Sequence, residues 1–260
     1  MLAFPQLITG ALTQYPLQKR HSARTIVNTL GDGNSIKLAD PCGEITEWQL
    51  QYTGLSDEEA SALETFFEAT EGGLRTFAFL DPTANLFAWS DRLDHSGWVK
   101  GPLLSISGGL ADPMGGANAW HLSNSGGAAQ RLSQTLEAPG GYVYCLSAYV
   151  KSSVSATLTL LHGSARADRG ITATWTRIAF SASGNPADEN VEFGIEVPAG
   201  GSLDLFGMQV EPQTGTSAYK ASTTGGIYPN AWFRDDTLAL TATDVNRHSA
   251  TVNIIHANRL

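Results

Sequence analysis

The sequence predicts a mainly β protein: a discontinuous β-rich domain with one α-helix, interrupted by an inserted jelly-roll β-sandwich. The first observation behind this prediction is a single well-capped helix pattern that ends before Pro82. The second is the long stretch that follows, where short strand patterns bounded by Gly and Pro recur about every 10 residues. The third is a hairpin pattern near the C-terminus that is too small to be stable alone.

The residues before the helix are typical of short strands joined by turns. Strand patterns cover Thr25–Leu30 and Ile36–Leu38, and the polar loop Gly31–Ser35 between them predicts a hairpin. A further alternating segment, Ile45–Tyr52, predicts a strand with one apolar face. We expect that face to pack on the helix; it consists of Trp48, Leu50 and Tyr52.

The helix pattern begins at Ser56, a natural N-cap, and stops at the Gly72-Gly73 pair. Glu59 completes a capping box with Ser56, and acidic residues in the first turn suit the helix dipole. The next strand is predicted over Leu74–Leu80, up to the turn dipeptide Asp81-Pro82. The helix has one apolar stripe that requires a sheet to cover it: Ala60, Leu63, Phe66 and Phe67.

The middle of the chain predicts a two-sheet sandwich of jelly-roll type and needs no helix. The strand patterns Tyr142–Val150 and Val154–His162 are separated by only three residues, which predicts a hairpin. Val191, Phe193, Ile195 and Val197 are expected to point inward from a later strand. The remaining predicted strands are Trp175–Ser181, Asn190–Val197 and Ser202–Val210.

The C-terminal hairpin pattern, Thr237–Thr243 followed by Ser249–His256, must pair with other strands because it is small. The economical solution is that it completes the first domain. We therefore predict one domain from residues 1–85 and 226–260, with residues 86–225 inserted into it at an exposed turn.

Charge excludes some classes of partner. The formal net charge is -9, and the longest basic run is Lys19-Arg20, so neither nucleic acid nor an anionic membrane surface is an expected partner. No apolar run is long enough to predict membrane insertion. The two cysteines, Cys42 and Cys145, lie far apart in the sequence and are interpreted as buried or idle thiols.

The sequence contains no arrangement that predicts catalysis. The six histidines are scattered singly, without the spacing of a metal site. Asp235 and Asp236 are adjacent at the start of a strand pattern, so their side chains are expected to point to opposite faces. A Gly-x-Ser-x-Gly nucleophile motif is absent. We therefore expect the protein not to be an enzyme.

The middle block resembles the carbohydrate-binding-module-like sandwich that is often fused to phage tail and fibre proteins. The similarity covers nearly all of residues 85–225 and implies a jelly-roll β-sandwich. Its anchors are Asn85-Leu86, Trp98-Val99-Lys100, Tyr142–Lys151, Thr174–Arg177, Leu205–Pro212, Ala218-Tyr219 and Thr223–Gly225.

The outer segments resemble the N-terminal domain of siphophage distal-tail and minor-tail proteins. The matching features are the capped helix pattern from Ser56 to Gly72, the segment Thr76–Pro82 and the segment Ala231–Leu238. The resemblance implies a ring, for which a hexamer is preferred over a trimer, between the tail tube and the baseplate hub proteins. It also implies that the inserted sandwich faces outward to meet a host-surface glycan or pilus. The second galectin-like domain of such proteins is not visible in this sequence.

Glycan recognition uses exposed aromatic faces beside groups that hydrogen-bond sugar hydroxyls. Trp98, Trp120 and Trp175 are interpreted as core aromatics of the sandwich. No cofactor is expected; the alternative is a structural calcium at the turn that contains Asp112. The candidate glycan-binding residues are Tyr142, Tyr144, Tyr149, His162 and Arg166.

The preferred interpretation is a structural virion protein that forms a ring at a phage tail tip, with an outward sandwich. The first alternative is a glycan-binding adsorption module, and a hydrolase of envelope polysaccharide ranks last. The N-terminal stretch does not have the pattern of a secretory signal, so synthesis in the host cytoplasm and a final location at the virion tail tip are expected.

Overall fold

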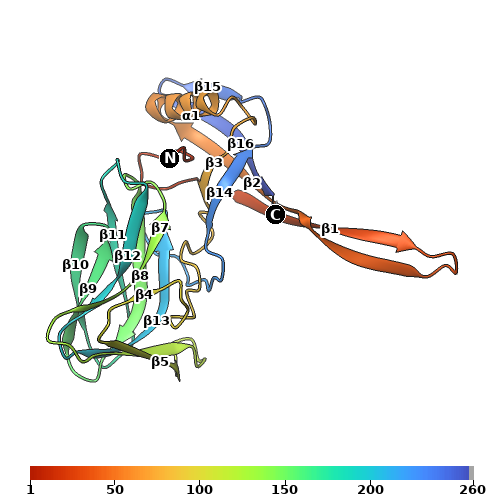
Figure 1. The fold of residues 1–260 in the computed structure, drawn as a ribbon. Coiled ribbons are helices and arrows are strands. Elements are labelled where there is room, and N and C mark those ends of the chain that lie inside the picture. Colours follow the sequence, from red (N-terminus) through yellow and green to blue (C-terminus); the bar gives the residue numbers. More distant parts are fainter. Residues whose placement is uncertain (258–260) are drawn as a thin grey trace. The chain divides into compact units, whose positions relative to one another are not determined.

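The computed structural model describes residues 1–257, except for the side chain of Pro41. Over these described residues the chain is mainly β, with one helix and three sheets (Figure 1). It forms two compact units. The sandwich unit consists mainly of Leu80–Ile227, and the helix unit consists of Leu2–Ile8, Thr13–Phe79 and the chain from Tyr228 onward. The predicted insert, 86–225, falls within the sandwich unit.

The helix unit is organised on a six-stranded sheet, with strand order β1-β2-β16-β14-β3 and with β15 also paired to β16. The C-terminal hairpin pairs with β2, as its small size required, because β16 lies along β2 from His248 to Ala257. The strands are β1 (Leu17–Thr29), β2 (Ser35–Leu55), β3 (Phe77–Leu80), β14 (Ile227–Phe233), β15 (Leu240–Asp244) and β16 (Arg247–Ala257).

The helix α1 (Asp57–Ala69) has the predicted capping box, in which Ser56 and Glu59 each accept from the other's backbone N–H. Of its predicted stripe, Phe67 is only half-buried, while Ala60, Leu63 and Phe66 are buried. The predicted strand face of Trp48, Leu50 and Tyr52 is also buried. Around the helix, aromatic rings pack edge to face, with ring centroids 5.0 to 5.8 Å apart: Phe4 with Phe66, and Phe66 with Phe77.

The strand predicted over Leu74–Leu80 is wrong in its first half, since β3 begins only at Phe77. The preceding residues are used in a turn that ends the helix. Gly72 has φ +64°, a left-handed conformation that favours glycine, and Gly73 N–H donates to Asp236 Oδ1 at 2.9 Å. Leu74 is 73% exposed as a result. Leu74 N–H donates to the Glu71 carbonyl and Arg75 N–H to the Thr70 carbonyl, so these donors are unavailable for a sheet ladder.

The sandwich unit consists of two five-stranded antiparallel sheets. One has the order β10-β9-β12-β7-β4 and the other β11-β8-β13-β6-β5. The predicted inward face of β12, from Val191 to Val197, is buried at every second residue. The strands are β4 (Val99–Lys100), β5 (Leu104–Leu110), β6 (Ala119–Asn124), β7 (Gln130–Glu137), β8 (Val143–Lys151), β9 (Ala156–His162), β10 (Ala165–Ile171), β11 (Thr176–Ser183), β12 (Asn190–Val197) and β13 (Ser202–Glu211).

The predicted hairpin between β8 and β9 is wrong, because these strands lie in different sheets. β8 pairs with β11 and β13, whereas β9 pairs with β10 and β12. The short link after Lys151 carries the chain across the sandwich, since Ser152 N–H donates to the Thr172 carbonyl at 2.8 Å and its hydroxyl donates to Ser202. The link is thus a hydrogen-bonded connection from one sheet to the other, and it is not the turn of a hairpin.

The chain enters and leaves the sandwich unit at the same place. Asp81 N–H donates to the Gly226 carbonyl at 2.8 Å, and the Asn85 side chain binds the backbone of Met208 and Val210 on β13. Adjacent chain ends are the arrangement that an inserted domain requires.

Candidate functional site

Two of the five sequence-predicted binding residues are in the core of the sandwich. Tyr144 and His162 are both 0% exposed. The Tyr144 hydroxyl donates to the Pro139 carbonyl at 2.8 Å, and its ring meets His162 edge to face at 5.6 Å. A glycan cannot contact either residue from solvent, so their expected role as binding groups is corrected to core packing.

His162 also has the electrostatics of a core residue. Its ring stacks on Phe193 with centroids 4.7 Å apart, and neither ring nitrogen has a hydrogen-bond partner among the described residues. Burial disfavours the charged form and lowers the pKa of His162 to about 4. The imidazole is therefore neutral at physiological pH.

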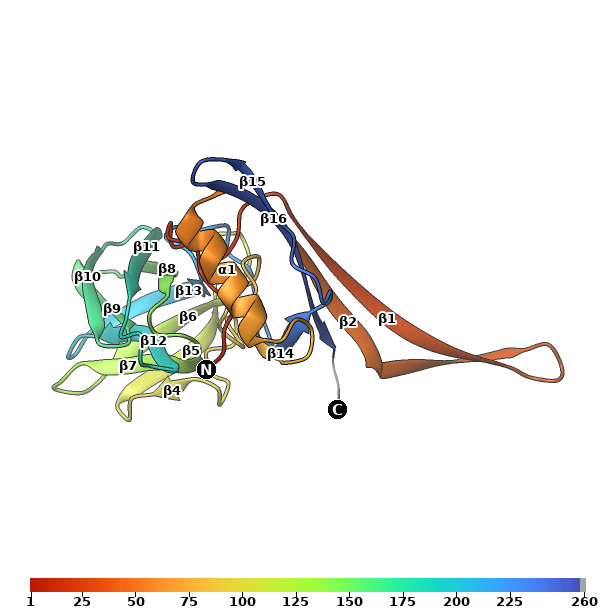
Figure 2. The same ribbon diagram turned by 90° about the horizontal axis from the view of Figure 1, so that it is seen from above.

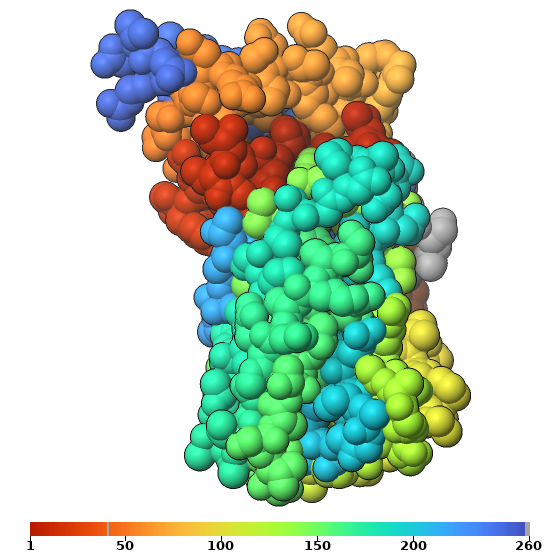
Figure 3. All heavy atoms as spheres, turned by 90° about the vertical axis from the view of Figure 1, so that its left-hand side faces the viewer, coloured from red at the N-terminus to blue at the C-terminus, as the bar shows by residue number. Residues whose placement is uncertain are grey.

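The other three predicted residues do not come together. Tyr142 is half-buried and stacks on Tyr144, and burial raises the pKa of its hydroxyl. Tyr149 lies on β8, where the Arg177 guanidinium covers its ring at 5.3 Å. Arg166 lies on β10, in the other sheet, and pairs with Glu196 at 3.8 Å. Figure 3 shows the surface over β9 and β10, coloured green. The five predicted residues therefore form no common site.

The structure instead contains a shallow basin of about 610 Å³ on the outer face of the sheet that includes β8, β13 and β6. Strand register creates it. Asp204 on β13 is paired with His121 on β6 and with Lys151 on β8, so the three side chains stand in a row on one face. Ser107 on β5 extends the row, because it is paired with His121.

The polar groups of the basin hold one another in place. His121 Nδ1 lies 2.7 Å from Asp204 Oδ1, and Lys151 Nζ lies 3.4 Å from Asp204 Oδ2. All three side chains remain partly open to solvent, with Asp204 the most covered at 21% exposure. A carboxylate held between two nitrogen groups keeps a fixed orientation while its remaining lone pairs face solvent.

An aromatic ring lies next to these charged groups. Trp175 lies in the segment between β10 and β11, and Lys151 Nζ is 4.9 Å from its ring centroid, a cation–π contact. Trp175 is partly exposed, so it is not the fully buried core aromatic that the sequence predicted. Trp120 is also partly exposed, whereas Trp98 is buried as expected.

The basin therefore combines a carboxylate, an imidazole, an ammonium group and a hydroxyl, and the ring of Trp175 lies against its Lys151. Such a set supplies both hydrogen-bond donors and acceptors around a flat apolar face. Sequence reasoning missed it because its residues are spread from Ser107 to Asp204 and only the sheet register unites them. The one local sign of the basin in the sequence is that Asp204 alternates with apolar residues in a strand pattern, which places its side chain on the face opposite to theirs.

The Asp112 turn, the candidate position for a structural calcium, is held together by hydrogen bonds to the Asp112 carboxylate. The carboxylate accepts from the backbone N–H groups of Met114, Gly116 and Asn118 at 2.8 to 3.1 Å, and from the Asn118 amide. Burial raises the pKa of Asp112, but these donors outweigh it and the net shift is downward. Among the described residues no group of three His, Cys, Asp or Glu is placed to hold a metal.

The cysteines form no disulfide: Cys42 is exposed and Cys145 is buried, where desolvation raises the pKa of its thiol. In the part of the chain that the structure describes, no helix is sufficiently long and apolar to cross a membrane.

Comparison with known proteins gives no match to a family model, and no curated protein matches. Several solved structures match this chain. The CBM22-1 xylan-binding domain of Paenibacillus barcinonensis Xyn10C is 15% identical over 51% of this chain and 96% of its own, with a TM-score of 0.41. A CBM4 module is 14% identical over 45% of this chain and 86% of its own, with a TM-score of 0.37.

A third match is the enzymatically active domain of tailspike protein 4 of bacteriophage CBA120. It is 14% identical over 51% of this chain, with a TM-score of 0.39, and the match spans 22% of the tailspike chain. The solved structures similar to this chain thus include carbohydrate-binding-module β-sandwiches and a phage tailspike domain.

Proposed function

We propose that this protein is a glycan-binding protein and that the basin on the sandwich is its binding site. The observation that carries the proposal is the row of His121, Asp204 and Lys151 beside the partly exposed Trp175. Sugars present apolar C–H faces and many hydroxyls, so they match an aromatic ring flanked by fixed donors and acceptors.

Each residue has a separate role in this proposal. Trp175 packs against the apolar face of a sugar ring. Asp204 accepts hydrogen bonds from two neighbouring hydroxyls, while Lys151 and His121 orient the carboxylate and donate to ring or hydroxyl oxygens. The basin is open and shallow, which suits a segment inside a polysaccharide chain better than a small molecule that must be enclosed.

The test starts with a glycan array of bacterial surface polysaccharides and plant β-glycans, followed by calorimetric titration of the best soluble oligosaccharide. Trp175→Ala and Asp204→Asn should each weaken binding by about tenfold or more, which is about 1.4 kcal/mol. Arg166→Ala and Asp168→Asn are matched controls, since both residues are on β10 in the other sheet and should leave affinity unchanged.

Two results would overturn the proposal. One is that the wild-type chain binds no glycan on the array. The other is that it binds, but the β10 controls weaken binding while Trp175→Ala does not. Folding of every variant is checked by circular dichroism, so that loss of binding is not loss of structure.

A second candidate function is a structural subunit of a phage tail tip, assembled as a ring between the tail tube and the baseplate. It is supported by the combination of a capped helix on a β-sheet with a sandwich inserted at Asp81 and Gly226, the organisation that the resemblance to distal-tail proteins implies. The two candidates are compatible, because a tail subunit can carry a glycan-binding insert.

Imaging of virions labelled at the exposed Asn185 tests this second candidate. Label in a symmetric collar at the tail tip is the expected result. Label on peripheral fibres, or none on the virion, would contradict it without affecting the glycan proposal. The hydrolase alternative gains no support from the basin, because glycoside hydrolysis uses two carboxylates and Asp204 is the one carboxylate among the described basin residues.

A further inference from the structure

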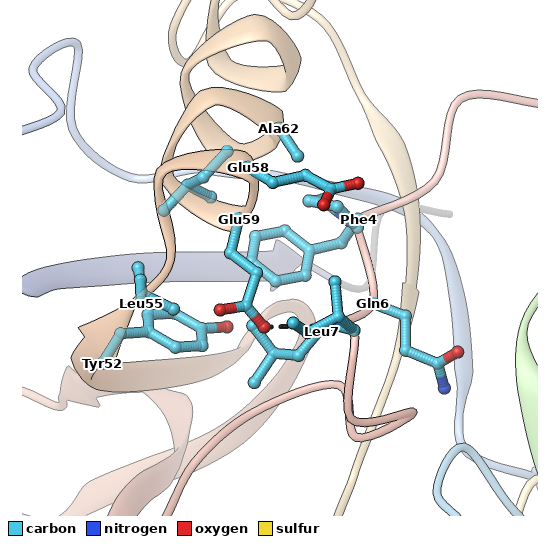
Figure 4. Close-up of a pocket in the computed structure, with 11 residues that line it drawn as sticks. Phe4, Gln6, Leu7, Tyr52, Leu55, Glu58, Glu59 and Ala62 are labelled. Atoms are coloured by element: carbon cyan, nitrogen blue, oxygen red, sulfur yellow. Dashed lines mark hydrogen bonds between the residues drawn. The ribbon is translucent and has the colours of Figure 1, made fainter. Parts of the chain in front are cut away.

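The helix unit contains a second hollow, which we call the pocket: a space of about 130 Å³ between the N-terminal segment and α1 (Figure 4). The N-terminal segment forms one wall because it is held at both ends. Phe4 N–H donates to the Ala78 carbonyl of β3 at 3.0 Å, and Ile8 N–H donates to Glu59 Oε1 of α1 at 3.1 Å. Every residue that lines the pocket belongs to the helix unit, so the pocket is separate from the basin.

The floor of the pocket is apolar. Phe4, Tyr52 and Leu55 are each at most 3% exposed. An apolar cavity of about 150 Å³ admits a benzene molecule, so the pocket has room for one side-chain stem of about four carbons. The Tyr52 hydroxyl points toward Glu59 in Figure 4, and burial raises its pKa, so it stays uncharged.

The rim of the pocket carries two carboxylates on the α1 side, and they differ. Glu59 is used within the chain, because one of its oxygens accepts from Ile8 N–H and the other accepts from Ser56 N–H at 3.0 Å. Glu58 is exposed and has no hydrogen bond or ion pair with another described residue. The pocket thus presents an uncompensated negative charge beside an apolar floor.

The negative charge continues along α1, which contains five acidic side chains and no basic one. Figure 2 looks down on α1 and shows it on the outside of the helix unit. Glu64 and Glu68 are exposed there, and at about 1.5 Å per residue Glu68 lies roughly 15 Å along the axis from Glu58. A ligand of pocket size cannot reach that far, but about five residues of an extended peptide can.

Charge decides between the possible occupants. Nucleic acid and anionic lipid have the same sign of charge as α1 and are repelled. A second copy of this chain has a net charge of -9, and its hairpin of residues 22–40 contains two basic and two acidic side chains, so it offers no complementary segment. A lysine side chain matches both parts of the pocket, since its methylene stem can cover apolar surface while its ammonium group stays at the rim.

We propose that the pocket binds a lysine side chain from a basic polypeptide segment of a partner protein, with the stem on the apolar floor and the ammonium group at Glu58. Further basic side chains of the same segment lie along Glu64 and Glu68. The chain therefore carries a binding surface for a basic peptide that requires neither the basin nor a glycan.

Titration of the full chain with a blocked pentalysine peptide at low salt, followed by calorimetry, tests the proposal. We expect saturable binding. Ala62→Trp, at an exposed position of the pocket, should weaken it about tenfold, the effect of losing about two buried methylene groups. Glu58→Gln should weaken it about two- to fivefold. Ala69→Trp, on α1 outside the pocket, and Glu137→Gln, on β7, are matched exposed controls that should leave affinity unchanged.

The length of the stem separates pocket binding from attraction by charge alone. A blocked peptide of five 2,4-diaminobutyric acid residues carries ammonium groups on stems of two methylene groups, so it should bind about tenfold more weakly than pentalysine. In the NMR spectrum of the labelled chain, pentalysine should shift the amide signals of residues 4–8 and 52–63. Equal affinity for the two peptides, unchanged affinity of Ala62→Trp, or no saturable binding of pentalysine would each overturn the proposal.

Discussion

Single residues of the sandwich core determine part of its response to acid. The pKa of His162 is about 4 in the folded protein, against 6.5 for an ordinary histidine, because burial disfavours the imidazolium. Between these pH values the unfolded chain binds more protons than the folded one, so the free energy of unfolding falls as the pH falls. The stability is complete above pH 6.5 and is lost progressively toward pH 4.

We predict that His162→Phe removes this component, since a phenyl ring can keep the stacking on Phe193. Between neutral pH and pH 4 the wild type should lose up to about 3 kcal/mol more than the variant. Urea unfolding at several pH values measures the difference. The exposed His21 provides the control, because His21→Gln should retain the wild-type slope. Parallel curves for wild type and His162→Phe would contradict the prediction.

The Asp112 turn provides a second prediction on single residues. Three backbone N–H groups donate to this buried carboxylate, and Asp112→Ala leaves them without it. We expect a loss of about 1 to 3 kcal/mol in the free energy of unfolding. Because the donors already use the carboxylate oxygens, adding a chelator should leave the wild-type melting temperature unchanged. A clear drop with chelator would show that a bound cation supports the fold.

At the scale of elements, local patterns predicted what local interactions determine. The capping box at Ser56, the inward face of β12 and the pairing of the C-terminal hairpin all follow from residues close in sequence or from the need to bury a small hairpin. The β8–β9 hairpin was wrong because sheet membership depends on long-range partners: β8 pairs with β11 and β13. The basin was missed for the same reason, since Asp204 meets His121 only through that register.

The hairpin of residues 22–40, which Figures 1 and 2 show as a two-stranded ribbon, permits a prediction for one element. Replacing residues 23–44 with Asn-Gly joins Ser22 to Ile45, its antiparallel partner, through a two-residue turn of the type that hairpins favour. None of the described residues removed is buried, so the variant should melt within a few degrees of the wild type. A large fall in melting temperature would mean that the hairpin packs against its own unit.

At the scale of the whole molecule, the two proposals place glycan binding and peptide binding on different units. The basin belongs to the sandwich unit, and the pocket belongs to the helix unit. Neither site shares a residue with the other, so each can be removed by mutation while the other is kept. This separation makes the relation between them measurable.

The basin and the pocket should bind their ligands independently. Coupling between two sites typically changes affinity about 5- to 150-fold, and it acts equally in both directions. We predict that a saturating oligosaccharide changes the affinity for the pentalysine peptide by less than about twofold, and that the peptide changes the affinity for the oligosaccharide as little. Trp175→Ala should weaken only oligosaccharide binding, because Trp175 lies against Lys151 of the basin. Ala62→Trp should weaken only peptide binding, because Ala62 lines the pocket. Calorimetric titration of each ligand, with and without the other, measures both affinities. If each ligand changes the affinity for the other by the same large factor, the two units are coupled, and the assignment of separate roles to them is wrong.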